Sequence, residues 1–132
     1  MIAPGHSGSE IFEVARYHPF ARAIYGPVLE QSGIGRQSYS KQLPPRIDFE
    51  LGVIAGGISL DPFAYMIAPE PQDGRVSVES TRIDGMRDHI VLPTSHELLA
   101  HHPLTVMQVI HFLRAGRFLH DPFGWSASAE AA

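Results

Sequence analysis

Two short apolar runs stand out from an otherwise mixed pattern of apolar and polar positions. Phe49–Ala55 (FELGVIA) is followed by Gly56-Gly57, and His89–Leu92 (HIVL) is followed by proline. Apolar runs of this length, bounded by glycine or proline, favour strands buried on both faces, as in parallel sheets. Met1–Ala3 is a shorter apolar stub that fits the tail of a third strand.

The clearest helix is predicted over Pro103–Ala115 (PLTVMQVIHFLRA). Proline suits the first turn of a helix and glycine the position just past its end, where Gly116 stands. Its buried face is expected to consist of the apolar residues at helical spacing, Val106, Val109, Ile110 and Leu113. A second helix is predicted over Ser9–Tyr17, where apolar residues also recur at helical spacing.

The order of the predicted elements is strand, helix, strand, loop, strand, helix, which indicates an α/β fold with a mostly parallel sheet. Parallel sheets have both faces covered and more strands than the two and a stub predicted here. We therefore expect one partial domain over residues 1–120, followed by a frayed tail over residues 121–132. The open sheet edge and uncovered apolar faces predict a homodimer or higher homo-oligomer.

Composition excludes several classes of function. The chain of 132 residues has a formal net charge of −4 and no basic stretch, which argues against a nucleic-acid partner. It contains no cysteine, so disulfides and thiolate metal sites are excluded, and a cytoplasmic location is expected. No apolar run approaches the roughly 20 residues that a membrane span needs.

Two titratable side chains are predicted at the carboxyl edge of the sheet. His96 lies just past the strand His89–Leu92, and Asp73 lies on the loop after the preceding strand. Catalytic loops gather at this edge in open α/β sheets, so His96 is a candidate general base and Asp73 the acid that orients it. Taken alone, Asp73-Gly74 is also a common turn pair and His96 an ordinary loop histidine. The rival acids are Asp61, nearer the strand end, and the less well placed Asp84 and Asp88.

Ser7 is the candidate nucleophile, because Gly5–Ser9 (GHSGS) comes close to the G-x-S-x-G turn of serine hydrolases. The order serine, aspartate, histidine along the chain is also the one that α/β-hydrolases use. However, Ser9 stands where that turn has glycine. Ser7–Glu10 is moreover a complete S-x-x-E capping box, in which the serine caps a helix. The local sequence favours the cap, and both roles remain open for Ser7.

The other histidines do not predict a metal site. There is no H-x-x-x-H pair and no carboxylate cluster, so neither a metal nor another cofactor is expected. His101 and His102 precede the last helix and are expected to cap it or face solvent. His111, on that helix, is expected to pack or face solvent.

Three further segments form a recognisable set: Asp73–Thr81 (DGRVSVEST), Asp88–His96 (DHIVLPTSH) and His111–Phe118 (HFLRAGRF). Together they resemble the C-terminal part of lipase-like α/β-hydrolases. In that family a D-G-x-V-S-V-x-S-T segment carries the acid of the triad, and a V-L-P-x-S/T-H segment carries the histidine. The resemblance therefore implies Asp73 as the acid and His96 as the base.

The same resemblance bears on the nucleophile. Met1–Pro4 is similar to the end of the strand after the family's nucleophile helix, and His6–Glu10 is similar to its P-x-x-x-G-S-E loop. The resemblance thus implies that the family's own nucleophile turn precedes Met1 and that the chain corresponds to a C-terminal portion. In such a chain, Ser7 would have taken over the role of nucleophile.

We therefore expect a truncated α/β-hydrolase-like sheet with flanking helices, completed by oligomerisation. The expected activity is hydrolysis of short-chain carboxylic esters by a Ser/His/Asp-type mechanism that uses Ser7, Asp73 and His96. The alternative is a catalytically silent remnant of a hydrolase that acts only as an assembly or binding module. A metal hydrolase built from the histidines ranks third.

Overall fold

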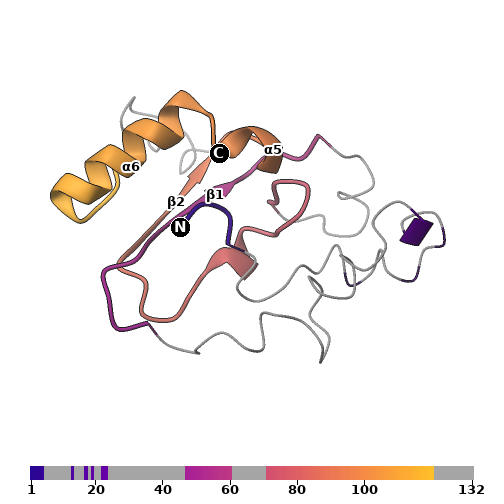
Figure 1. Ribbon diagram of the computed structural model, residues 1–132, viewed down its shortest axis with the longest axis horizontal. Coiled ribbons are helices and arrows are strands. Elements are labelled where there is room, and N and C mark those ends of the chain that lie inside the picture. The colour runs from indigo at the N-terminus through magenta and orange to yellow at the C-terminus, as the bar shows by residue number, and fades with distance from the viewer. Residues whose placement is uncertain are drawn as a thin grey trace, which may run out of the picture.

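The computed structural model describes residues 1–4, 47–60 and 71–120, together with Glu13, Tyr17, Pro19, Arg22 and Ala23. Ser7, Asp61, most of the predicted helix Ser9–Tyr17 and the tail 121–132 lie outside these residues. In chain order the described elements are β1 (Gly52–Gly56), a 3-10 helix (Glu79–Thr81), β2 (Asp88–Leu92), α5 (His96–Leu99) and α6 (Pro103–Ala115) (Figure 1).

The sheet is parallel, with Gly52 of β1 opposite Asp88 of β2. The predicted stub also joins it, since Ile2 forms a parallel bridge with Ile54 on the other side of β1. The Ala3 amide donates to the Ile54 carbonyl at 2.7 Å. The structure therefore has the α/β character that the sequence predicts, with β1 between the N-terminal segment and β2.

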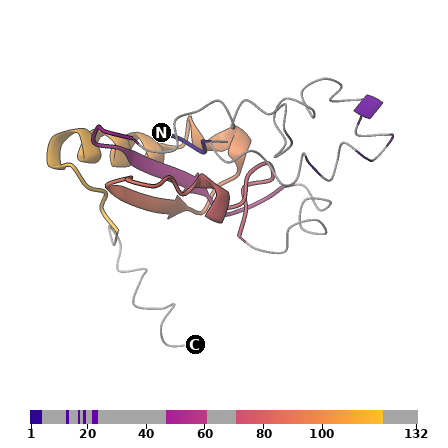
Figure 2. The ribbon, with the colours of Figure 1, turned by 90° about the horizontal axis from the view of Figure 1, so that it is seen from below.

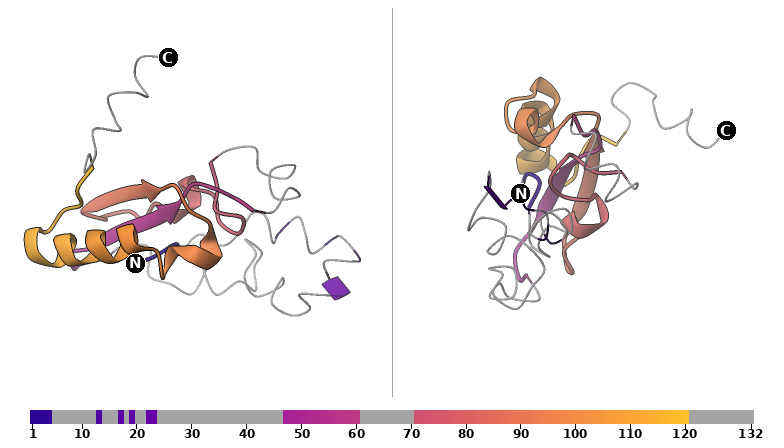
Figure 3. Two further views of the ribbon diagram at one scale, coloured as in Figure 1. Left: turned by 90° about the horizontal axis from the view of Figure 1, so that it is seen from above. Right: turned by 90° about the vertical axis from the view of Figure 1, so that its right-hand side faces the viewer.

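The two faces of the sheet carry different layers. Both helices lie on one face, and the segment with the 3-10 helix lies on the other (Figure 2, Figure 3). The cluster on the helix side contains Ala3, Ile54, Ile90, Leu92, Leu99 and Phe118. The cluster on the opposite side contains Leu51, Val53 and Ile83. Successive residues of β1 thus enter opposite cores, as the period of a strand requires.

The strand boundaries differ from the sequence prediction by a few residues. The predicted strand Phe49–Ala55 begins later, at Gly52, and continues through Gly56. Phe49 stands before the ladder with 57% of its surface exposed. The predicted strand His89–Leu92 starts one residue earlier, at Asp88. The segment Arg75–Thr81 forms turns that end in the 3-10 helix.

Helix α6 has the bounds that the sequence predicts. His102 caps its start, where the imidazole Nδ1 accepts from the Leu104 amide at 3.3 Å. Gly116 ends it with φ of 68°, a left-handed conformation that glycine adopts without strain, and its amide donates to the Phe112 carbonyl. None of the helices in the described part of the chain has the length and apolarity that crossing a bilayer needs.

The predicted apolar face of α6 is confirmed for Val109 and wrong for the other three residues. Val106, Ile110 and Leu113 are exposed, whereas Thr105 and Gln108 are buried. The sheet-facing side also includes the partly buried Leu104, Val109 and Phe112. Gln108 is tolerated inside because its amide exchanges two hydrogen bonds, both of 2.8 Å, with the backbone of Leu119. The chain that returns past the helix therefore decides which side of α6 is buried.

Candidate functional site

Asp73 occupies a tight turn after β1, and one of its oxygens builds that turn. Its Oδ1 accepts hydrogen bonds from the backbone amides of Arg75 at 3.0 Å and Val76 at 2.8 Å. Gly74 has φ of 101°, a conformation that favours glycine, and its amide donates to Gln72 Oε1 at 2.7 Å. The interpretation of Asp73-Gly74 as a turn pair is therefore correct. The turn uses only Oδ1, one of the two carboxylate oxygens of Asp73.

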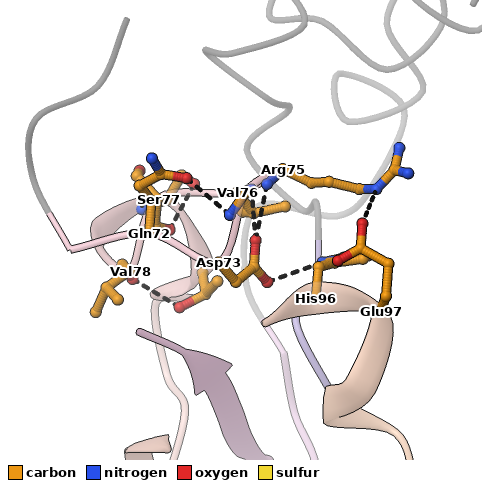
Figure 4. A network of polar contacts seen from close by, with 11 residues as sticks. Gln72, Asp73, Arg75, Val76, Ser77, Val78, His96 and Glu97 are labelled. Atoms are coloured by element: carbon orange, nitrogen blue, oxygen red, sulfur yellow. Dashed lines mark hydrogen bonds and ion pairs between the residues drawn. The ribbon is translucent and has the colours of Figure 1, made fainter. Parts of the chain in front are cut away.

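The other oxygen of Asp73 faces His96, as Figure 4 shows. Asp73 Oδ2 lies 2.8 Å from His96 Nδ1, and the His96 amide donates to the Asp73 carbonyl at 2.9 Å. The Asp73 side chain is 1% exposed, whereas the His96 side chain is 31% exposed. The structure thus brings together the two side chains that the sequence places at the carboxyl edge of the sheet.

This geometry selects the tautomer of His96. An ionised carboxylate only accepts hydrogen bonds, so Nδ1 carries the proton that is shared with Asp73. The opposite ring nitrogen, Nε2, then has a lone pair whenever the imidazole is neutral. Within the described part of the chain no residue donates to Nε2. A half-exposed imidazole of this kind can take a proton from a hydroxyl group placed against Nε2.

The position of the pair depends on the end of β1. A Cβ atom added at Gly56 would lie 2.7 Å from Asp73 Cβ and 2.6 Å from the carbonyl oxygen of Thr94. Thr94 belongs to the loop that leads from β2 to His96. Gly56 therefore lets the two loops approach each other at the carboxyl edge of the sheet. From the sequence, Gly56 was interpreted only as part of a strand-end turn.

An ion pair lies beside the Asp73–His96 pair. Arg75 Nε donates to Glu97 Oε1 at 3.2 Å, and it joins the residue after Gly74 to the residue after His96 (Figure 4). Burial acts to raise the pKa of Glu97, but hydrogen bonding with its own backbone amide and with Arg75, together with the nearby positive charges, lowers the pKa on balance. Sequence reasoning missed this pair, because neither residue belongs to a pattern with known chemistry.

The other acids and serines that the structure describes do not join the pair. Ser95, the neighbour of His96, is 1% exposed and its Oγ is buried, so it is unavailable as a nucleophile. Asp84 is exposed. Asp88 faces the other end of β2, where it accepts from the Phe118 amide at 2.7 Å and pairs with His120. Ser7 and the rival acid Asp61 lie outside the described residues.

Three further described histidines have structural contacts. His102 caps α6, and His111 Nδ1 donates to the Arg117 carbonyl at 2.7 Å. His89 Nε2 lies 2.9 Å from Thr81 Oγ1, which itself donates to the Val78 carbonyl at 2.6 Å, so the imidazole is the donor to Thr81. Among the described residues no cluster of three or more histidine or carboxylate side chains is placed to hold a metal ion.

The lowered pKa of His89 is expected to make the free energy of unfolding depend on pH. Burial lowers its pKa, and the charge of Arg82 acts in the same direction. Below the unfolded pKa of about 6.5 the unfolded chain therefore binds more protons than the folded one, and stability is lost as the pH falls through the folded pKa. Urea unfolding of the wild type should show a steeper loss of stability below about pH 6.5 than unfolding of His89→Gln, which keeps a donor but does not titrate. Parallel curves for the two proteins would contradict this account.

Comparison of the chain with protein-family models, with curated proteins and with solved structures gave no match. The chemistry of the site is therefore inferred from its own geometry and from the residues of this chain.

Proposed function

We propose that this protein hydrolyses short-chain carboxylic esters, with Asp73 and His96 as the acid and base of a Ser/His/Asp-type mechanism. The observation that carries the proposal is the 2.8 Å contact between the buried Asp73 carboxylate and Nδ1 of the half-exposed His96. A buried acid, an imidazole oriented by it and an Nε2 atom to which no described residue donates are three features that favour proton transfer to and from a nucleophile. The resemblance of Asp73–Thr81 and Asp88–His96 to segments of lipase-like α/β-hydrolases agrees with the same roles.

In the proposed mechanism, a serine hydroxyl attacks the carbonyl carbon of the ester while His96 Nε2 takes its proton. The Asp73 carboxylate stabilises the imidazolium that forms. The tetrahedral intermediate then expels the alkoxide, which takes the proton from Nε2 and leaves as the alcohol. Water attacks the acyl-serine in the second half, again with Nε2 as base, and the carboxylic acid is released as the serine recovers its proton.

Ser7 is the proposed nucleophile, on the ground of its GHSGS context and its place ahead of Asp73 and His96 in the chain. Backbone amides at the start of the predicted helix Ser9–Tyr17 are the proposed donors to the oxyanion. Loss of a single such donor costs on the order of 10²–10³ in rate in hydrolases. A site that is incompletely built is therefore expected to be slow but measurable.

We further propose that the fold is that of a truncated α/β-hydrolase whose sheet is completed by a second copy of the chain. Support comes from the exposed apolar residues of α6, namely Val106, Ile110 and Leu113. Exposed apolar surface of this kind also favours the second candidate function, a silent module that assembles or binds. Sedimentation or light scattering at micromolar concentration tests the oligomer, and a clean monomer argues against it.

Turnover of p-nitrophenyl acetate and butyrate tests the proposed activity. Wild type is expected to release nitrophenolate, His96→Ala to fall to background and Ser7→Ala to lose most of the rate. The matched control is His101→Ala, since His101 is an exposed histidine near the end of α5 and outside the pair. This control is expected to keep the wild-type rate.

The pattern of the losses separates the alternatives. Activity that is lost in His96→Ala but kept in Ser7→Ala assigns a different nucleophile and retains the proposed base. Activity that survives in both variants at the wild-type level contradicts the proposed mechanism. Absence of turnover in the wild type favours the assembly or binding module.

A further inference from the structure

The contacts around Asp73 and His96 form a closed ring. Asp73 Oδ2 contacts His96 Nδ1 at 2.8 Å, and Asp73 Oδ1 accepts from the Arg75 amide at 3.0 Å. The Arg75 side chain then reaches Glu97 at 3.2 Å, and Glu97 is bonded to His96 through the peptide. Every residue of this ring belongs either to the Asp73 turn or to the first turn of α5, and two of the contacts join the turn to the helix (Figure 4).

We propose that Arg75 and Glu97 are positioning residues, which hold His96 in the orientation where Nδ1 faces Asp73. This inference rests on the proposed function for its catalytic consequence, although the orientation itself is a property of the fold. The other hydrogen bonds described between α5 and the Asp73 turn are those that His96 itself makes with Asp73. Without the ion pair, the orientation of the imidazole depends on its own hydrogen bond with the Asp73 carboxylate.

The ion pair is suited to orientation more than to stability. The side chains of Arg75 and Glu97 are 34% and 54% exposed, and exposed pairs add little to the free energy of folding. The pair spans 22 residues of sequence and links the Asp73 turn to α5, so it constrains how these two segments meet. Catalytic rates depend steeply on such placement.

A second exposed ion pair provides a matched control. Arg82 Nε donates to Glu79 Oε2 at 3.1 Å, with exposures of 50% and 76% for the two side chains. It has the same chemistry as the Arg75–Glu97 pair, but it joins residues three apart within one turn and touches neither Asp73 nor His96. Glu79→Ala is therefore expected to change neither the state of His96 nor the rate.

The test measures the tautomer of His96 directly, by the nitrogen-15 chemical shifts of its ring at a pH where the imidazole is neutral. In Glu97→Ala the ratio of the Nδ1–H to the Nε2–H tautomer is expected to fall about two- to fivefold, the range that an exposed pair can supply. The kcat for p-nitrophenyl butyrate is expected to fall by a similar factor, with KM unchanged. The charge exchange Arg75→Glu with Glu97→Arg is expected to recover most of both losses.

The two readouts separate this inference from the proposed function. A wild-type tautomer ratio in Glu97→Ala overturns the positioning role, whether or not the protein hydrolyses esters. A changed ratio in a protein that shows no turnover retains the positioning role and rejects the proposed activity. Equal changes in Glu97→Ala and Glu79→Ala, or no recovery on charge exchange, also contradict the positioning role.

Discussion

Asp73→Asn is expected to lower kcat for ester hydrolysis by about 10³–10⁴-fold while it leaves the turn intact. The amide oxygen of asparagine can still accept from the backbone amides of Arg75 and Val76, which lie 3.0 and 2.8 Å from Asp73 Oδ1. The group that faces His96 then becomes an NH₂ donor in place of a carboxylate oxygen. Nδ1 must accept from it, so the proton of the neutral ring moves to Nε2. In that tautomer His96 cannot take the proton of a nucleophile.

The measurement is kcat for p-nitrophenyl butyrate together with the thermal unfolding midpoint. Asp73→Ala is the informative comparison, because it removes both acceptors and should lower the unfolding midpoint as well as the rate. Asp73→Asn should lose the rate with a near wild-type midpoint. If Asp73→Asn kept more than about a tenth of the wild-type kcat, the orienting role of Asp73 would be wrong.

Gly56→Ala is expected to damage both the fold and the site. The new Cβ atom would lie 2.6 Å from the Thr94 carbonyl oxygen and 2.7 Å from Asp73 Cβ. Neither atom is the end of a flexible side chain, so the backbone on at least one side must move. Overpacking of this kind costs about 1–3 kcal/mol of stability. A displacement of Asp73 or of the loop before His96 should also lower kcat by about 10²-fold.

The adjacent glycine supplies the control for this prediction. A Cβ at Gly57 would meet a methyl group of Val91 at 2.9 Å and the Leu92 carbonyl oxygen at 3.6 Å. Val91 is 42% exposed, so its side chain can give way. Urea unfolding and kcat should therefore show a small change for Gly57→Ala and a large one for Gly56→Ala. Equal losses in the two variants would mean that the site does not depend on the space at Gly56.

Much of the candidate site could be predicted from the sequence, because its two main residues follow strands. Asp73 and His96 come after separate strand segments, and the carboxyl ends of parallel strands lie at one edge of a sheet. The choice among the aspartates was harder, since the sequence also offers Asp61, near the strand end, and the less well placed Asp84 and Asp88. Asp88 is an example of the difficulty. It is the first residue of β2, whereas His96 follows the other end of this strand, and it contacts Phe118 and His120.

The supporting residues could not be predicted. In the sequence, Arg75 and Glu97 are ordinary polar residues. They form a pair only because the Asp73 turn and α5 approach each other in the fold. In the sequence, Gly56 is an ordinary glycine at the end of a strand. Its role depends on the close approach of Asp73 and Thr94, which only the folded chain shows. Ser7, the predicted nucleophile, lies outside the described residues, so its role stays a prediction.

The amino-acid sequence by itself determined three of the local elements, β1, β2 and α6. Pro103 and Gly116 set the bounds of α6, and the short apolar runs set β1 and β2 to within a few residues, because these signals act between neighbours in the chain. Only the tertiary structure decided which side of α6 is buried and which carboxylate meets His96. Both depend on contacts between residues far apart in sequence: Gln108 with Leu119, and Asp73 with His96 across 23 positions. The strand pattern indicates at which edge of the sheet a residue lies, but the contacts themselves form only when packed elements bring distant segments together.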